Sequence, residues 1–252
     1  MALISTPAII LSAFRYGETS KIVRLATRDH GVQSAIAKGA LRPRSRFGAA
    51  LQVLSAGQAQ LYLSDRRELH TLAAFDLETV PVQLAEHVGR YATATALAEI
   101  VLRVAPAEPH PEAFDVLEQA LLALSGAPLE QLPARSLRVL WQLVAALGFA
   151  PALERCVRDG RPLGEGAMAF SAPEGGALCV HCGRSTEVTA LPVEARTALE
   201  QLTDPSSTLP ALDPRNFAAH RRLLARYVRY HLAEGASLPA LEFWLQRAWG
   251  SA

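Results

Sequence analysis

The sequence predicts an α+β protein in which a small five-stranded β-barrel is followed by a mainly helical domain. Residues 1–79 contain short apolar segments separated by turn residues, which is typical of strands. From about residue 80, apolar residues recur at helical spacing. All three cysteines fall between 156 and 182. We therefore expect a barrel domain at 1–79 and a helical domain at 80–252, with a zinc-knuckle-like insertion at about 153–188.

The strands of the first domain are short and closely spaced. Gln58 to Leu63 alternates, with Ala59, Leu61 and Leu63 on one face, as in a half-buried strand. The expected strands are 6–14, 21–27, 32–37, 51–55, 58–63 and 69–75. About five strands in such a short stretch favour an oligonucleotide-binding (OB) barrel.

The helices of the second domain are separated by proline and glycine, which interrupt helical periodicity. The expected helices are 84–104, 112–124, 134–147, 192–202, 216–232 and 238–249. Trp141 and Phe149 are expected in the core. In 216–232 we expect a basic face of Arg221, Arg222, Arg226 and Arg229 and a buried side of Leu223, Leu224, Tyr227, Val228 and Tyr230. Such a face is commonly only solvated; contact with phosphate or an acidic peptide is the alternative.

The net charge of +1 hides an asymmetry along the chain. Residues 1–75 hold ten Lys or Arg against four acids, a net charge of +6, which leaves −5 for the remainder. A basic module joined to a mildly acidic body suits binding of a polyanion by one part and of proteins by the other. Neither a secretory signal nor a transmembrane segment is recognisable, and the cysteines do not form a disulfide framework, so we expect a cytoplasmic protein.

The most basic stretch is the loop KGALRPRSRF at 38–47, whose four cations are accompanied by no acid. Arginine forks pair with phosphate oxygens, and Phe47 adds a ring for stacking on an unpaired base. Arg28 lies nearby in the sequence. The predicted DNA contacts are Lys38, Arg42, Arg44 and Arg46, helped by Arg15, Lys21 and Arg24. The alternative is a solvated loop whose charge only aids solubility.

The cysteines follow the pattern C-x2-D, nineteen residues, C-x2-C, formed by Cys156, Asp159, Cys179 and Cys182. The x2 spacing turns two side chains toward one tetrahedral centre, and Gly160 and Gly183 follow the two halves. Three thiolates and a carboxylate carry the same charge as four thiolates. The pattern therefore predicts one structural zinc ion.

Other interpretations of the cysteines stay open. Cys179 and Cys182 are alternatively a free thiol pair, with Cys156 a small buried apolar residue. A redox Cys-x-x-Cys is a third interpretation, although no thioredoxin-like pattern surrounds it. His181 and Glu174 are weaker candidates for a fourth ligand.

Motifs of nucleotide hydrolysis are not found in the sequence: no GxxxxGK[ST] loop is present, so we expect no bound nucleotide. HExxH, G-x-S-x-G and paired-carboxylate nuclease patterns do not stand out either, and the seven histidines are scattered. We therefore expect a binding protein and not an enzyme.

Four motifs together resemble the RecO family of bacterial recombination mediators over essentially the whole chain. They are K-G-x-x-x-P-R-S-x-F at 38–47, LGF-x-P-x-L-x-x-C at 147–156, FS-x-x-x-GG-x-x-C-x-x-CG at 170–183 and YVRYHL at 227–232. Their order and spacing carry the resemblance. It implies an OB barrel, a helical domain with a zinc-knuckle-like insertion, and no catalytic turnover.

The resemblance also implies partners and activities. Family members bind single- and double-stranded DNA, anneal complementary strands, work with RecR, contact the acidic C-terminal tail of single-stranded DNA-binding protein (SSB) and help to load RecA. For that tail we select Arg135 and Arg138, beside Trp141 on their helix. This setting is cytoplasmic, with association to the nucleoid during repair. Asp159 departs from the family pattern, where zinc-binding members have cysteine. An RNA-binding assembly factor that uses the same basic barrel is the alternative.

Overall fold

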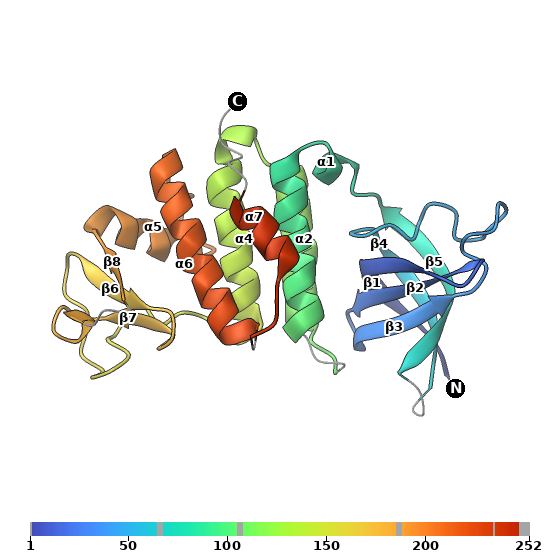
Figure 1. Cartoon of the computed structure of the whole chain (residues 1–252), viewed down its shortest axis with the longest axis horizontal. Helices are drawn as coiled ribbons and strands as arrows, with labels where there is room; N and C mark the ends of the chain where they lie inside the picture. The colour runs from blue at the N-terminus through green and yellow to red at the C-terminus, as the bar shows by residue number, and fades with distance from the viewer. Residues whose placement is uncertain (1, 65–67, 105–107, 185–187, 234, 247–252) are drawn as a thin grey trace. The chain divides into compact units, whose positions relative to one another are not determined.

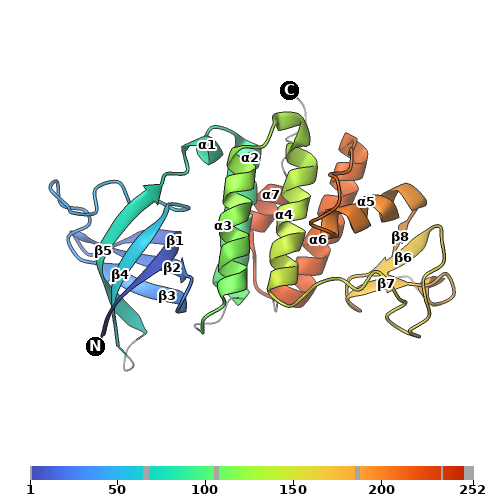
Figure 2. The ribbon, with the colours of Figure 1, turned by 180° about the vertical axis from the view of Figure 1, so that it is seen from behind.

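The computed structural model describes residues 2–64, 68–104, 108–184, 188–233 and 235–246. Its contacts divide the chain into two compact units. One unit comprises Met1–His87 with Leu97–Ser125, and the other comprises Val88–Ala96 with Gly126–Ala252. Figures 1 and 2 together label the strands and the α-helices of both units.

The first unit contains a closed five-stranded barrel with strand order β1-β2-β3-β5-β4. The strands are β1 (Ala2–Tyr16), β2 (Ser20–Thr27), β3 (Gly31–Ala37), β4 (Ala56–Leu63) and β5 (Leu69–Thr79). Neighbouring strands are antiparallel except β3 and β5, which run parallel. This arrangement confirms the predicted OB-type barrel ahead of a helical domain.

Alternation along the strands builds the barrel core. Val23, Leu25 and Ala35 point inward and are fully buried, while the residues between them face outward. Gly57 is required by a close approach, since a Cβ atom there would lie 2.2 Å from the carbonyl oxygen of Asp76. Glycine is thus needed where the register of β4 against β5 shifts.

The predicted strand at 51–55 is wrong. This segment is a turn, with Leu54 at a φ of 71°. Leu51 nevertheless packs into the barrel core, and Leu54 and Ser55 exchange two backbone hydrogen bonds with Ile10 of β1, over 2.7 and 2.9 Å, without forming a strand. The strand prediction failed here because a short apolar run does not distinguish a strand from a buried loop.

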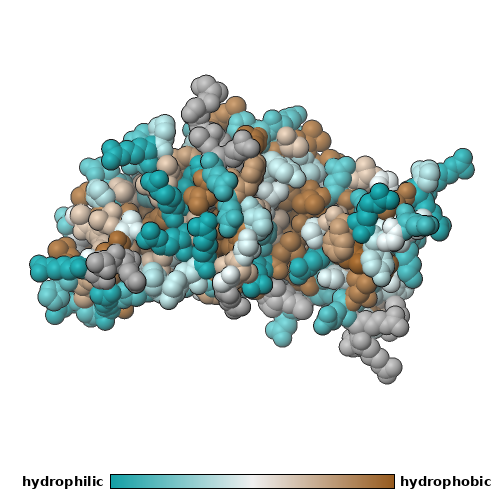
Figure 3. Space-filling model, in the orientation of Figure 1, coloured by the Kyte–Doolittle hydropathy of each residue, from teal (hydrophilic) through white to brown (hydrophobic). Residues whose placement is uncertain are grey.

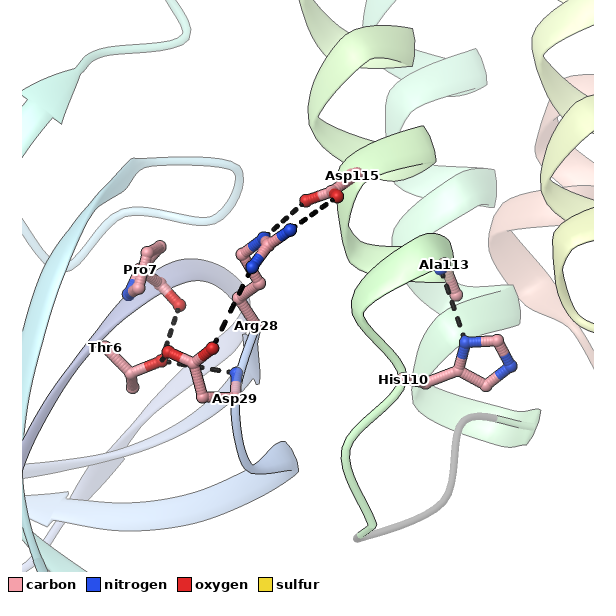
Figure 4. A network of polar contacts seen from close by, with 7 residues as sticks. All are labelled: Thr6, Pro7, Arg28, Asp29, His110, Ala113 and Asp115. Atoms are coloured by element: carbon pink, nitrogen blue, oxygen red, sulfur yellow. Dashed lines mark hydrogen bonds and ion pairs between the residues drawn. The ribbon is translucent and has the colours of Figure 1, made fainter.

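Arg28, in the turn between β2 and β3, is tied to a helix of the same unit. Its guanidinium donates to both carboxylate oxygens of Asp115, over 2.8 and 2.9 Å, in α3 (Pro111–Ser125) (Figure 4). Arg28 is therefore committed to an ion pair.

The short helix α1 (Val82–Ala85) precedes α2 (Val88–Val104), so the helix expected at 84–104 is divided near residue 87.

The second unit is built around α4 (Leu132–Ala146), which packs against α5 (Val193–Thr203) and α6 (Pro214–Leu232) (Figure 2). Trp141 is 1% exposed and meets the ring of Tyr227 edge-on at 5.2 Å, which confirms its predicted place in the core. Phe149 is half-buried. Asp213 caps α6, because its Oδ1 accepts a 2.7 Å bond from the amide of Asn216.

The predicted faces of α6 need two corrections. Arg221 is not on a solvated basic face: it is buried, lies over the rings of Phe217 and Trp244, and donates to the carbonyl of Trp244 in α7 (Pro239–Gln246). Tyr230 is exposed and not on the buried side. Helical spacing places a residue on a face, but it does not show which partners line that face. Residues 247–249 of the predicted last helix lie outside the described residues.

A second, three-stranded sheet was not predicted. It has the order β7-β6-β8 and consists of β6 (Met168–Ser171), β7 (Gly176–Leu178) and β8 (Thr189–Leu191). Strands of three or four residues carry too few positions for a periodic signal. Within the described ranges, no helix is long and apolar enough to cross a membrane.

Candidate nucleic-acid interface and metal cluster

The basic loop, residues 38–55, lies over one end of the barrel. Successive turns shape it, with Ser45 and Gly48 donating to the carbonyls three residues earlier over 3.0 and 3.2 Å. Its apolar side chains Ala40, Phe47, Ala50 and Leu51 join the barrel core. The cations Lys38, Arg42, Arg44 and Arg46 are all exposed. The loop is therefore amphipathic: its apolar residues anchor it and its cations face solvent, and Figure 3 shows hydrophilic side chains projecting where the loop lies in Figure 1.

Phe47 does not have the predicted stacking role. The ring is 2% exposed within the barrel core, and the Arg46 guanidinium lies over it at 5.1 Å. Burial of this large apolar side chain is favoured by the free energy of removing its surface from water. Phe47 thus anchors the loop in the barrel core and is too buried to stack on a base.

The three helper cations differ in their surroundings. Arg15, near the end of β1, is exposed. Lys21 is half-buried and its ammonium donates to the Leu51 carbonyl over 3.2 Å, so it fastens the basic loop to β2. Arg24 is half-buried on the outer face of β2, with its Nε unpaired among the described residues. Cationic side chains thus lie both on the basic loop and on the adjoining strands.

The predicted metal ligands come together in the second unit. One ligand atom from each of Cys156, Asp159, Cys179 and Cys182 lies within 4.8 Å of all the others. The Sγ atoms of Cys179 and Cys182 lie 3.6 and 3.5 Å from Asp159 Oδ2. A tetrahedral zinc ion with bonds of about 2.3 Å requires ligand atoms about 3.8 Å apart. The donor set and its spacing therefore fit zinc.

Electrostatics of the cluster follow from its hydrogen bonds. The Arg161 amide and the Cys156 thiol lower the pKa of Asp159 to about 2, so this carboxylate is charged at neutral pH. Desolvation, followed by the neighbouring thiols and Asp159, raises the pKa of Cys182 to about 12. Desolvation and the negative charge of Asp159 both oppose the release of a proton from Cys182 while no cation is present.

Two weaker ligand candidates lie outside the cluster. Glu174 is paired with Arg158 through two 2.7 Å hydrogen bonds, and the same guanidinium donates to the Cys182 carbonyl over 2.9 Å. His181 is exposed and does not join the four ligand atoms. Glu174 instead positions Arg158, which braces the turn after Cys179.

The predicted tail-binding arginines line a groove of about 540 Å³. Arg138 is 6% exposed and donates to the carbonyls of Gln201 and Thr208 over 2.8 and 2.9 Å. Burial, followed by the nearby charge of Arg135, lowers the pKa of Arg138. Trp141 does not line the groove; apolar surface comes from Pro133, Leu209, Pro210 and Leu212.

Comparisons with known proteins agree with a two-part chain of this kind. A family model for the N-terminal part of recombination protein O matches residues 1–80, and one for its C-terminal part matches residues 86–239. The protein named DNA repair protein RecO of Anaeromyxobacter dehalogenans strain 2CP-C is 33% identical over 249 residues, 96% of each chain. The protein of the same name from Symbiobacterium thermophilum is 36% identical over 185 residues, 72% of each chain. The chain therefore belongs to the RecO family of DNA repair proteins.

Proposed function

We propose that this chain binds single- and double-stranded DNA, anneals complementary strands and, with RecR, helps to load RecA onto single strands coated with SSB. The observation that carries the proposal is the basic loop, which presents four exposed cations at one end of an OB barrel. Phosphate contacts of this kind bind DNA of any sequence, as annealing requires. The proposal needs binding alone and no catalytic step, and its setting is the bacterial cytoplasm, at the nucleoid during repair.

The test is binding to fluorescent single-stranded DNA across a salt series. We expect steep salt dependence, annealing without ATP, and loss of both when Arg42, Arg44 and Arg46 are changed together to Glu. A matched control changes Arg222, Arg226 and Arg229 to Glu, because these exposed arginines of α6 give the same change in net charge. If both triple variants lose affinity equally, the basic loop is not the main contact, and either net charge or a phosphate contact by α6 accounts for the binding. If wild type binds structured RNA and not DNA, the RNA-binding alternative replaces the proposal.

A structural zinc ion is the cofactor that we propose. Cys156, Asp159, Cys179 and Cys182 would hold it, and when bound it would cross-link the two halves of the knuckle. Atomic emission on protein purified without chelators tests this proposal. We expect one equivalent of zinc in wild type and in His181→Ala, and much less in Cys179→Ser. A cooperative fold without zinc in wild type would refute the metal site.

For the acidic tail of SSB we propose the groove beside Arg135 and Arg138. A cation would clamp the carboxylates while the apolar lining accepts the end of the peptide. Because Arg138 also bonds two backbone carbonyls, the test uses Arg135→Ala and a labelled peptide with the SSB tail sequence. We expect Arg135→Ala to weaken peptide binding and Arg229→Ala, in a separate groove, to leave it unchanged. The opposite result would move the tail to α6.

A further inference from the structure

The outer face of the barrel carries an apolar row across three strands. Phe14 of β1 pairs in register with Ile22 of β2, and Ile22 pairs with Ile36 of β3. The neighbouring residues Val23 and Ala35 are fully buried in the core. Since successive side chains of a strand point to opposite faces, Phe14, Ile22 and Ile36 share the outer face. Tyr16 follows on the same face, two residues beyond Phe14.

The two rings of this row are held out of the core. Phe14 is 51% exposed and Tyr16 is 52% exposed, whereas Phe47 at the same barrel end is buried. Ile22 and Ile36 are half-buried beside them. One exposed apolar residue is ordinary, but two aromatic rings on one strand face, next to two isoleucines, form an apolar patch. Its flat rings offer the geometry that stacks on planar ligands.

The basic loop reaches this patch. The Leu41 amide donates to the Thr19 carbonyl, in the turn between β1 and β2, over 2.9 Å. Lys38 directly follows Ala37, which pairs with Lys21 of β2. On the other side of the apolar row, Arg24 shares the outer face and pairs with Ser12 and Ser34. Cations therefore flank the rings on both sides, so a bound strand can make phosphate and base contacts together.

We propose that Phe14 and Tyr16 stack on unpaired bases and make this face selective for single strands. The inference rests on the proposed DNA binding and adds the residues that distinguish single strands from duplex. Phosphates are common to both forms, whereas only unpaired bases expose a face for stacking. OB barrels use the face of strands 2 and 3 and the loop between strands 1 and 2 for such ligands. Arg15 lies between the two rings in sequence and therefore points to the other side of β1.

The test compares Phe14→Leu and Tyr16→Leu with wild type on three labelled ligands of equal length: oligo-dT, an abasic strand and a duplex. Leucine keeps an apolar side chain and removes the ring. We expect each variant to bind oligo-dT at least about fivefold more weakly, the lower limit of base stacking on an aromatic ring. Duplex affinity and the salt dependence should stay as in wild type. Wild type should prefer oligo-dT over the abasic strand, and the double variant should lose that preference.

Tyr62→Leu is the matched control, because Tyr62 is an exposed ring of β4 that pairs with Leu3 at the other end of β1. It should bind all three ligands as wild type does. The stacking role is refuted if wild type binds DNA and both variants keep full affinity for oligo-dT, or if duplex affinity falls equally. Absence of salt-dependent DNA binding in wild type would instead refute the proposed function on which the inference rests.

Discussion

Gly176→Ala should separate β7 from residues 152–157, the segment that contains Cys156. A Cβ atom at Gly176 would lie 2.3 Å from the Ala152 carbonyl oxygen and 2.9 Å from a methyl carbon of Val157. Ordinary contact begins at about 3.4 Å, so the two backbones must separate by about 1 Å. That carbonyl also accepts the amide of Ala177 over 2.8 Å, and this hydrogen bond cannot survive such a displacement.

The expected loss of local stability follows from the three hydrogen bonds that join β7 to residues 152–157. The amides of Ala152 and Val157 donate to the carbonyls of Gly175 and Ala177 over 3.0 Å each. Losing two of the three junction bonds, at about 1 kcal/mol each, with some residual overpacking, gives about 2 to 3 kcal/mol. A local opening that is easier by this amount raises amide exchange about 30- to 150-fold. Because Cys156 lies in the displaced segment 152–157, the affinity for zinc should fall as well.

Hydrogen exchange at the amides of Val157 and Ala177 measures the effect. Gly164→Ala is the control, since a Cβ atom there meets nothing within 4 Å, and it should exchange as wild type does. Equal exchange rates at these amides in Gly176→Ala and Gly164→Ala would refute the close-packed junction.

Three further predictions concern the two units. Trp141→Ala should lower the free energy of unfolding by about 3 to 5 kcal/mol, because it empties a fully buried site; chemical denaturation measures this loss, and Gln142→Ala is the control. Asp115→Asn should destabilise the protein near neutral pH but not in acid. Arg28 lowers the pKa of Asp115, so the contribution of the pair is present above the ordinary pKa of 3.8 and lost as the pH falls through the lowered value. His220 is buried and its pKa is lowered by desolvation. Wild type should therefore lose stability as the pH falls below the ordinary value of 6.5. Thermal unfolding of His220→Leu should show a shallower pH dependence than that of wild type.

The barrel was predictable because its strands have a strong period. In β4, Ala59 and Leu61 are fully buried and alternate with Gln58, Gln60 and Tyr62, and this pattern fixes which side of the strand is buried. The segment 51–55 has similar apolar character, but it forms a turn whose Leu54 and Ser55 exchange hydrogen bonds with Ile10 of β1, and not a strand. Its Leu51 contributes to the core from a loop, a role that depends on how the chain returns over the barrel end and that local spacing does not encode.

The metal cluster was predictable in its members but not in its supports. The x2 spacing brings Cys156 near Asp159 and Cys179 near Cys182 through local turns. What holds the two pairs together is distant in sequence: the hydrogen bonds between Ala152 and β7, and the fork of Arg158 on Glu174. In the sequence, Glu174 near a cysteine pair fits either a ligand or an ion-pair partner, and the position of Arg158 decides between the two roles.

Rings and guanidinium groups show why composition alone does not locate a binding surface. Phe47 lies in the most basic loop yet is buried, and Arg221 lies in a basic helix yet is covered by Phe217 and Trp244. Phe14 and Tyr16 lie at a strand end and are exposed. Tertiary contacts that no local pattern encodes bury Phe47 and Arg221. Phe14 and Tyr16 instead share the side of β1 that faces away from the core, which becomes known once the register of β1 against β2 is known. A basic stretch therefore predicts polyanion binding, and the register of the adjoining strands predicts which rings are free to stack on bases.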